Sequence, residues 1–348
     1  MIASDVLEWL LEPDLVNPGV RYFALRDLLE RSEEDLELIQ ARQAILSTGR
    51  VSKILSAQHS DGYWFKPGAS YSPRYRGTVW QILFLSELGA DPLDERVKRG
   101  CEYLIEHNMA SNGAFSCNQP PTPDGALHCL NGNLIHALVQ LGYGDDPRLQ
   151  SAIDWQVRSI TGEGEIEFFA SGTAGPGFAC KFNQGLPCGW GAVKALKALS
   201  AIPWEKRTPA MQRAIQAGAE FLLSRDPSLA DYPNSGRVSP AWHKFGFPLS
   251  YWSDVLENVA VLVDLGFGSH PGLANAIQFI LAKQDAQGRW KLENSLNSKM
   301  WVDIEKLGKP SKWITLRAWR VLKRAGHWKS QPGTSRESER GRDSAHQE

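Results

Sequence analysis

The motif Gln-x3-Gly-x-Trp occurs twice in this chain, more than two hundred residues apart. The copies are residues 58–64 (QHSDGYW) and residues 284–290 (QDAQGRW). Each copy follows an apolar run typical of the end of a helix, at residues 54–57 and 279–282. Because a reused structural unit constrains an architecture more than any isolated residue does, the motif predicts a repeat-built fold.

Two kinds of predicted helix alternate along the chain. The first kind is amphipathic, with Pro near its first turn and Lys or Arg near its last, which are ordinary start and stop signals. We predict it at 91–107, 147–158, 209–225 and 271–283. The second kind is richer in small and apolar residues and mostly follows a loop rich in Gly and Pro. We predict it at 21–29, 77–88, 129–141, 188–199, 251–265 and 312–323.

The apolar helices decide the predicted architecture, because a helix that is apolar nearly all round must be buried on nearly all sides. Six such helices, each shielded by an amphipathic partner, fit a closed ring. We therefore predict an all-α protein with a single (α/α)6 toroid domain at residues 1–326. An open superhelical stack would show the same alternation. Residues 327–348 are predicted to be a disordered tail, because they cannot bury enough apolar surface to offset their ordering entropy.

The motif and the six hairpins together carry a family resemblance. Gln-x3-Gly-x-Trp after an outer helix resembles the QW motif of squalene-hopene and oxidosqualene cyclases, and residues 112–115 (NGAF) resemble a degenerate third copy. The ring of hairpins is also similar to the β subunits of protein prenyltransferases. The likeness covers roughly residues 15–325. It implies a scaffold role for Trp64 and Trp290, packed between hairpins, and does not by itself imply an activity.

The chain also departs from both groups of relatives. The cyclases take their proton from an Asp-x-Asp-Asp run, which this sequence lacks. Prenyltransferase β subunits hold zinc partly through Asp-x-Cys at the start of an inner helix. Here Leu127 and Leu186 stand two positions before Cys129 and Cys188. Neither known activity therefore transfers directly to this chain.

The bulk properties exclude some partners. A net charge of -1 supplies no electrostatic attraction to nucleic acid or to an anionic membrane. The start of the sequence has no signal-peptide pattern, and no run approaches the length of a membrane span. We therefore expect a cytoplasmic protein whose cysteines are thiols or metal ligands rather than disulfides.

Cysteine placement is the strongest chemical signal. Cys129 and Cys188 begin the third and fourth inner helices, and Cys117 and Cys180 lie in the loops before them. Thiolates are stabilised at a helix N-terminus, and four of them can bind zinc tetrahedrally. We predict a zinc site at these four cysteines. Alternatively, they are small residues that fill helix contacts, or His128 replaces one ligand.

Asp254 and Glu257 form the clearest carboxyl pair. They lie one turn apart near the predicted start of the fifth inner helix. Such a pair faces one direction and, when desolvated, can share a proton, as a general acid for an alkene or epoxide requires. These two residues are the predicted catalytic pair. The alternative is structural: the acids cap the helix or pair with Lys244 or Lys312.

Residues near the inner-helix starts are expected to line a central cavity. Aromatic rings there stabilise cations and pack against isoprenoid chains. The predicted lining residues are Asn131, Asn133, Trp190, Tyr251 and Lys312.

Three functions follow from these predictions. The first is an enzyme of terpenoid type, a lyase, isomerase or transferase, that acts with zinc on an isoprenoid or other hydrophobic substrate. The second is a metal-free toroid that binds a lipid. The third is a carbohydrate-active (α/α)6 enzyme, which needs two carboxyls at the cavity mouth. The sequence leaves a partner subunit undetermined.

Overall fold

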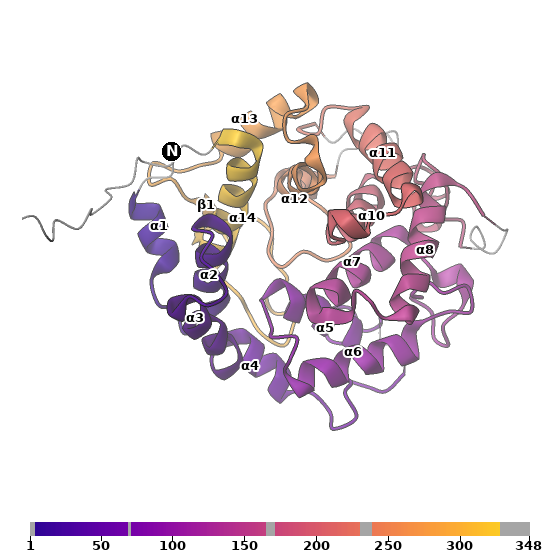
Figure 1. Ribbon diagram of the computed structural model, residues 1–348, viewed down its shortest axis with the longest axis horizontal. Helices are drawn as coiled ribbons and strands as arrows, with labels where there is room; N and C mark the ends of the chain where they lie inside the picture. Colours follow the sequence, from indigo (N-terminus) through magenta and orange to yellow (C-terminus); the bar gives the residue numbers. More distant parts are fainter. Residues whose placement is uncertain (1–3, 69–70, 165–170, 230–238, 328–348) are drawn as a thin grey trace, which may run out of the picture.

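The protein is mostly helical and belongs to the all-α class (Figure 1). The computed structural model describes residues 4–68, 71–164, 171–229 and 239–327. Within these ranges, one short antiparallel pair joins β1 (Trp290–Lys291) to β2 (Pro310–Ser311). No helix in the described ranges combines the length and the apolarity that a membrane span requires. The predicted tail lies, from residue 328 onward, outside the described residues.

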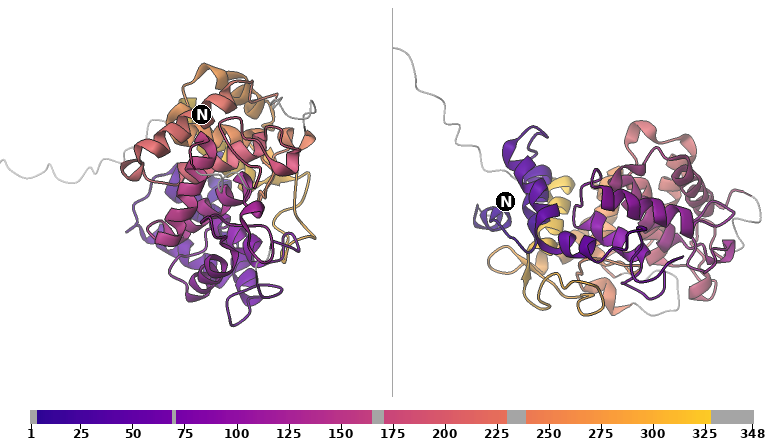
Figure 2. Two further views of the ribbon diagram at one scale, coloured as in Figure 1. Left: turned by 90° about the vertical axis from the view of Figure 1, so that its right-hand side faces the viewer. Right: turned by 90° about the horizontal axis from the view of Figure 1, so that it is seen from below.

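The apolar helices predicted from the sequence lie at the centre of the molecule. They are α2 (Pro18–Phe23, continued by a π-helical turn at Ala24–Leu28), α5 (Thr78–Glu87), α7 (His128–Leu138), α10 (Gly189–Ser200), α12 (Val255–Leu262) and α14 (Lys312–Leu322). From α5 onward each contacts the next, and α14 contacts α2. Gly19 of α2 in turn lies against the backbone of Leu88 at the end of α5. The first and last of these central helices, α2 and α14, lie side by side, as Figures 1 and 2 show.

Amphipathic helices pack on the outside of these central helices (Figure 1). In chain order α3 contacts α2, α6 contacts α5, α8 contacts α7, α11 contacts α10 and α13 contacts α12. Their bounds are Leu36–Ser47 for α3, Glu95–Asn108 for α6, Pro147–Thr161 for α8, Pro209–Leu223 for α11 and Ala274–Ala282 for α13. Two further helices, α1 (Ser4–Leu11) and α4 (Gly49–Ser56), precede and follow the first of these pairs. Four of these helices, α6, α8, α11 and α13, correspond to the amphipathic helices predicted from the sequence, whereas α3 was not predicted.

Side-chain caps decide where several helices begin. Asp94, Asp146 and Thr208 each accept a backbone N–H from the first turn of the following outer helix. The prediction was wrong at the fifth inner helix, which begins at Val255 rather than at residue 251. Asp254 is its capping residue and has extended backbone angles, so the helix cannot begin earlier.

The two Gln-x3-Gly-x-Trp segments make matching contacts. Trp64 and Trp290 are fully buried, and each indole donates to a carbonyl ten residues earlier, at 2.8 and 2.7 Å. The backbone N–H of each Trp donates to a threonine hydroxyl of the next inner helix, Thr78 at 3.1 Å and Thr315 at 3.0 Å. Gln58 donates to the carbonyls of Gly62 and Arg96, tying the turn to α6. These contacts give the motif the scaffold role that the resemblance implied.

The degenerate third copy uses the same arrangement with a different acceptor. The N–H of Phe115 donates to the side-chain oxygen of Asn131 at 2.7 Å. The Asn131 amide in turn donates to the carbonyls of Phe115 and Leu127. Asn131 therefore holds the loop to α7, and its amide is committed to the scaffold.

Candidate functional site

One pocket lies among the loops that precede α7, α10 and α12, where the sequence placed the cavity mouth. It has a volume of about 470 Å³. We name it the aromatic pocket. Its lining residues are Tyr71, Arg74, Leu127, Cys129, Cys180, Phe182, Asn183, Cys188, Trp190, Ser239, Trp242 and Tyr251.

Aromatic rings form much of the wall of this pocket. The Trp190 ring centroid lies 6.4 Å from that of Trp242 and 6.2 Å from that of Tyr251. Arg74 lies over Tyr251, with its guanidinium carbon 5.0 Å from the ring centroid. Trp190 and Tyr251, both predicted as cavity residues, are thus brought together here. The buried Trp190 indole N–H has no hydrogen-bond partner among the described residues.

Three of the four cysteines predicted as zinc ligands line the aromatic pocket: Cys129, Cys180 and Cys188. Cys117 is not among the lining residues, and its sulfur contacts the Asn118 side chain at 3.7 Å. Within the described ranges, no three His, Cys, Asp or Glu side chains are arranged to hold a metal ion. Zinc binding by the four cysteines stays a prediction.

A short antiparallel bridge brings Cys180 and Cys188 together. Ala179 pairs with Pro187, and the N–H groups of Cys180 and Cys188 donate across the pair at 3.1 and 2.9 Å. Because side chains alternate between the faces of such a ladder, the two cysteines, one residue beyond the bridge on each strand, share a face. Cys188 also caps α10, since its sulfur accepts the N–H of Gly191 at 3.3 Å.

The thiols in this pocket differ in acidity. The hydrogen bond with Cys188 lowers the pKa of Cys180 despite burial, and the N–H groups of Phe182 and Asn183 act in the same direction. The same contact, together with burial, raises the pKa of Cys188. Burial raises the pKa of Cys129 to about 12. The interaction between the two thiols therefore makes Cys180 the more acidic of the pair.

His128, the alternative zinc ligand, is not one of the residues that line the aromatic pocket. It is buried between the rings of Trp155 and Phe178, and its Nδ1 lies 2.9 Å from the Gln156 amide nitrogen. Burial lowers the pKa of His128 to about 3, so the ring is neutral near pH 7. Cys101, the fifth cysteine, is fully buried in the apolar core.

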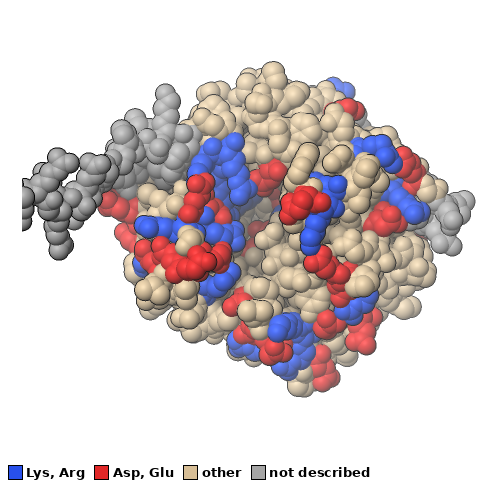
Figure 3. All heavy atoms as spheres, viewed as in Figure 1, with Lys and Arg blue, Asp and Glu red and all other residues tan. Residues whose placement is uncertain are grey.

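A second cavity, of about 230 Å³, lies between the C-terminal halves of the inner helices. Figure 3 shows side chains of both charges around a hollow near the middle of the face it draws. We name this space the charged cavity. Its charged lining residues are Arg26, Asp27, Glu87, Lys197, Glu257, Asp264, Arg317, Arg320 and Arg324. His136 also lines it.

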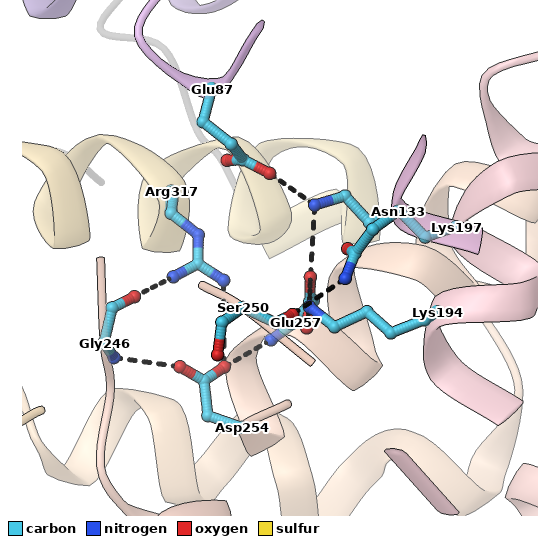
Figure 4. A network of polar contacts seen from close by, with 9 residues as sticks. All are labelled: Glu87, Asn133, Lys194, Lys197, Gly246, Ser250, Asp254, Glu257 and Arg317. Carbon is cyan, nitrogen blue, oxygen red and sulfur yellow. Dashed lines mark hydrogen bonds and ion pairs between the residues drawn. The ribbon is translucent and has the colours of Figure 1, made fainter. Parts of the chain in front are cut away.

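A buried ion network forms one wall of the charged cavity (Figure 4). The Lys194 ammonium lies 2.7 Å from both oxygens of Glu257, and the side chains are 0% and 4% exposed. Lys197 lies 3.2 Å from Glu257 and also pairs with Glu87. Burial alone would raise the pKa of Glu257, but Lys194 and Lys197 outweigh it and lower that pKa. Glu257 is therefore held as a carboxylate, which is a poor proton donor.

Asp254 caps α12 rather than facing a cavity. Its carboxyl accepts the N–H groups of Glu257 at 2.7 Å and Gly246 at 3.0 Å, and Arg317 lies 3.7 Å away (Figure 4). Burial raises the pKa of Asp254 in spite of Arg317. The residue lines neither of the two cavities. The capping alternative thus describes Asp254, and its general-acid role stays a prediction.

The alternative prediction that Asp254 or Glu257 pairs with Lys244 or Lys312 was wrong. Glu257 pairs with Lys194 and Lys197 of α10, because α10 is the neighbour of α12 in the packing. Lys312 instead lies 3.4 Å from Glu12 and lines neither cavity. Asn133 donates to the Ser250 carbonyl at 2.8 Å, which ties α7 to the loop before α12 (Figure 4).

Sequence reasoning missed Lys194 and Lys197. Both lie in the helix GWGAVKALKALS, three residues apart, in a segment that is otherwise small and apolar. Charges on a helix predicted to be buried need partners, because an unpaired buried charge is costly. That conflict was the available signal for the ion network.

Comparisons with known proteins leave the family open. No protein family and no curated protein matches the chain. Among solved structures, the chain is similar to the type II terpene cyclase MstE from Scytonema. The structure with the substrate geranylgeranyl dihydroxybenzoate is 14% identical over 80% of this chain and 96% of that chain, with a TM-score of 0.30. The structure with the product merosterolic acid A is 13% identical over 80% and 95%, also with a TM-score of 0.30. A likeness at this TM-score carries no argument about function.

Proposed function

We propose that residues 1–326 form one (α/α)6 toroid whose aromatic pocket binds an apolar small molecule of isoprenoid or similar lipid character. The observation that carries the proposal is the wall of this pocket. Tyr71, Trp190, Trp242 and Tyr251 line it together, and Arg74 is the one Lys, Arg, Asp or Glu among its described lining residues. Aromatic faces of this kind pack against apolar chains, and the pocket volume lies in the usual range for small-molecule sites.

Polarity favours the aromatic pocket over the charged cavity as the site for such a ligand. The charged cavity is lined by ion pairs, including Glu87 with Lys197 and Arg324 with Asp264. An apolar ligand placed there would remove water from these charges without supplying hydrogen bonds, which is unfavourable. The aromatic pocket imposes a much smaller cost of this kind.

Binding rather than catalysis is the better-supported form of the proposal. The predicted acid Asp254 is committed to two backbone N–H groups and lines neither cavity, and Glu257 is neutralised by lysines. Neither carboxyl lines the aromatic pocket, where an alkene would receive a proton. The zinc-dependent enzyme therefore ranks below a lipid-binding toroid.

Two measurements test this function. Solvent extraction of the purified full-length protein, followed by mass spectrometry, is expected to release a co-purified lipid. Titration of the delipidated protein with farnesol is expected to change the tryptophan fluorescence, because Trp190 and Trp242 line the pocket. The change should saturate as the pocket fills.

A matched pair of variants assigns the site. Trp190→Ala is expected to weaken farnesol binding by about tenfold or more, since a wall ring is lost. Trp204→Ala is the control, because Trp204 is 69% exposed and does not line the pocket. Equal affinities for the two variants, with both proteins folded, would exclude the aromatic pocket. Saturable binding of a hexose in place of farnesol would instead support the carbohydrate-active alternative.

A further inference from the structure

We propose that Cys180 and Cys188 form a dithiol site that exchanges with small-molecule disulfides and closes to an intramolecular disulfide in the wall of the aromatic pocket. The proposal goes beyond ligand binding, and it depends on the backbone ladder and on access from the pocket.

The ladder supplies the proximity. Cys180 and Cys188 lie on one face of the bridge between Ala179 and Pro187, as diagonal neighbours. The two thiols also shift each other's pKa in opposite directions, so their side chains lie near one another. The segment between them is a turn closed by the N–H groups of Asn183 and Gly185, both of which donate to the Cys180 carbonyl. Diagonal neighbours in a ladder lie about 7–8 Å apart, slightly beyond the usual Cα separation of about 4.4–6.8 Å in a disulfide, so closure requires this turn to move.

The pocket supplies access. Both sulfur-bearing side chains line a space of about 470 Å³, so a small disulfide can reach them without unfolding. The turn between them is exposed at Phe182, which is 69% accessible, so it has room to move when the cysteines approach. Cys101 provides the contrast, because it is fully buried in the core and has no such access.

The chemistry balances with a disulfide co-substrate such as oxidised glutathione. One cysteine thiolate attacks a glutathione sulfur, the glutathione S–S bond breaks, and one glutathione leaves as a thiolate that takes a proton from water. The second cysteine, as thiolate, then attacks the protein sulfur of the mixed disulfide, and the second glutathione leaves. Two electrons pass from the protein dithiol to the glutathione disulfide.

The experiment uses the reduced full-length protein with oxidised glutathione at pH 8. Remaining thiols are blocked with iodoacetamide, and the protein is digested with trypsin. Lys181 lies between the two cysteines, so trypsin separates them and only a disulfide keeps their peptides joined. We expect a non-reduced peptide pair linking Cys180 to Cys188, which disappears after treatment with dithiothreitol.

Single variants trap the intermediate. Cys188→Ser is expected to stop at one glutathione on Cys180, and Cys180→Ser at one glutathione on Cys188, because the resolving thiol is missing. Cys101→Ala is the matched control, because Cys101 lies in the core and does not line the pocket, and it is expected to form the linked pair as the wild type does.

Three outcomes would overturn the proposal. They are a linked pair that contains Cys129 in place of either residue, glutathione retained by the wild type without closure, and stoichiometric zinc that blocks exchange until a chelator removes it. Farnesol titration of the Cys180→Ser/Cys188→Ser variant separates the two proposals, since pocket binding without exchange leaves the proposed function standing.

Discussion

Replacing Lys194 by Met tests whether the buried ion network holds the inner helices together. Lys194 of α10 and Glu257 of α12 meet at 2.7 Å with side chains 0% and 4% exposed. Removing one partner of a buried pair leaves the other charge uncompensated, which costs about 3–5 kcal/mol of unfolding free energy. Because Lys197 remains 3.2 Å from Glu257, we expect Lys194→Met to lie near the lower end, about 3 kcal/mol.

The double variant Lys194→Met/Glu257→Met distinguishes a charge effect from lost packing. It removes both charges and keeps side chains of similar volume, while Lys197 retains its pair with Glu87. Replacement of a whole buried pair by apolar residues is often neutral or stabilising. We therefore expect the double variant to be more stable than Lys194→Met alone, with a coupling free energy of about 2–3 kcal/mol.

The assay is equilibrium unfolding in urea, followed by circular dichroism and by tryptophan fluorescence. Coinciding transitions from the two probes justify a two-state comparison. Lys206→Met is the control, because its pair with Asp145 is exposed, at 52% and 82%, and should contribute less than about 1 kcal/mol. If the effects of Lys194→Met and Glu257→Met add within about 0.5 kcal/mol, the reasoning about the network is refuted.

Three further predictions concern packing, the repeated motif and pH. A Cβ at Gly132 of α7 would lie 2.2 Å from a carbonyl oxygen of α10, so Gly132→Ala is expected to lower the free energy of unfolding by about 3 kcal/mol or more. Gly144→Ala is the control: its Cβ would lie 3.8 Å from the nearest atom, so it should change stability by less than about 1 kcal/mol in the same urea assay. Thr78→Val and Thr315→Val each leave the buried backbone N–H of a motif tryptophan without its acceptor, so each variant should be less stable by about 1–3 kcal/mol. Unchanged urea midpoints would show that the motif has no scaffold role. Burial, with Lys197 nearby, lowers the pKa of His136 to about 3. Between about pH 6.5 and pH 3, His136 is therefore protonated in the unfolded chain but not in the folded chain. Stability should therefore fall as pH drops from 6.5 toward 3, by up to about 1.4 kcal/mol per pH unit from this group, and His136→Gln should flatten that slope in urea unfolding at stepped pH.

Much of the secondary structure could be predicted from the sequence because its signals are local. The turn glycines Gly62 and Gly288 have positive φ of +103° and +78°, and each precedes a buried Trp by two residues. Proline starts such as Pro147 and Pro209 coincide with the observed first residues of α8 and α11. These features depend on neighbours in sequence, so periodicity and turn chemistry were sufficient to place them.

The candidate site was predicted only in part. Trp190, Tyr251 and three cysteines do line one pocket, because each lies at the start of an inner helix or in the loop before it. Asn131 lies in the same kind of position but holds the loop that contains Phe115. The sequence showed where these residues stand along their helices, and it contained no information on which loop would occupy their hydrogen-bonding groups.

By itself, the sequence determined the alternation of inner and outer helices and the turns that join them, since both follow from local periodicity, capping and glycine geometry. Only the tertiary structure decided which helices are neighbours. That choice pairs Glu257 with Lys194 and leaves Asp254 as a helix cap. It also sets Cys180 beside Cys188 across a short bridge. The physical reason is that ion pairs, pockets and thiol contacts depend on distances between segments far apart in the chain, and these distances exist only after the helices pack.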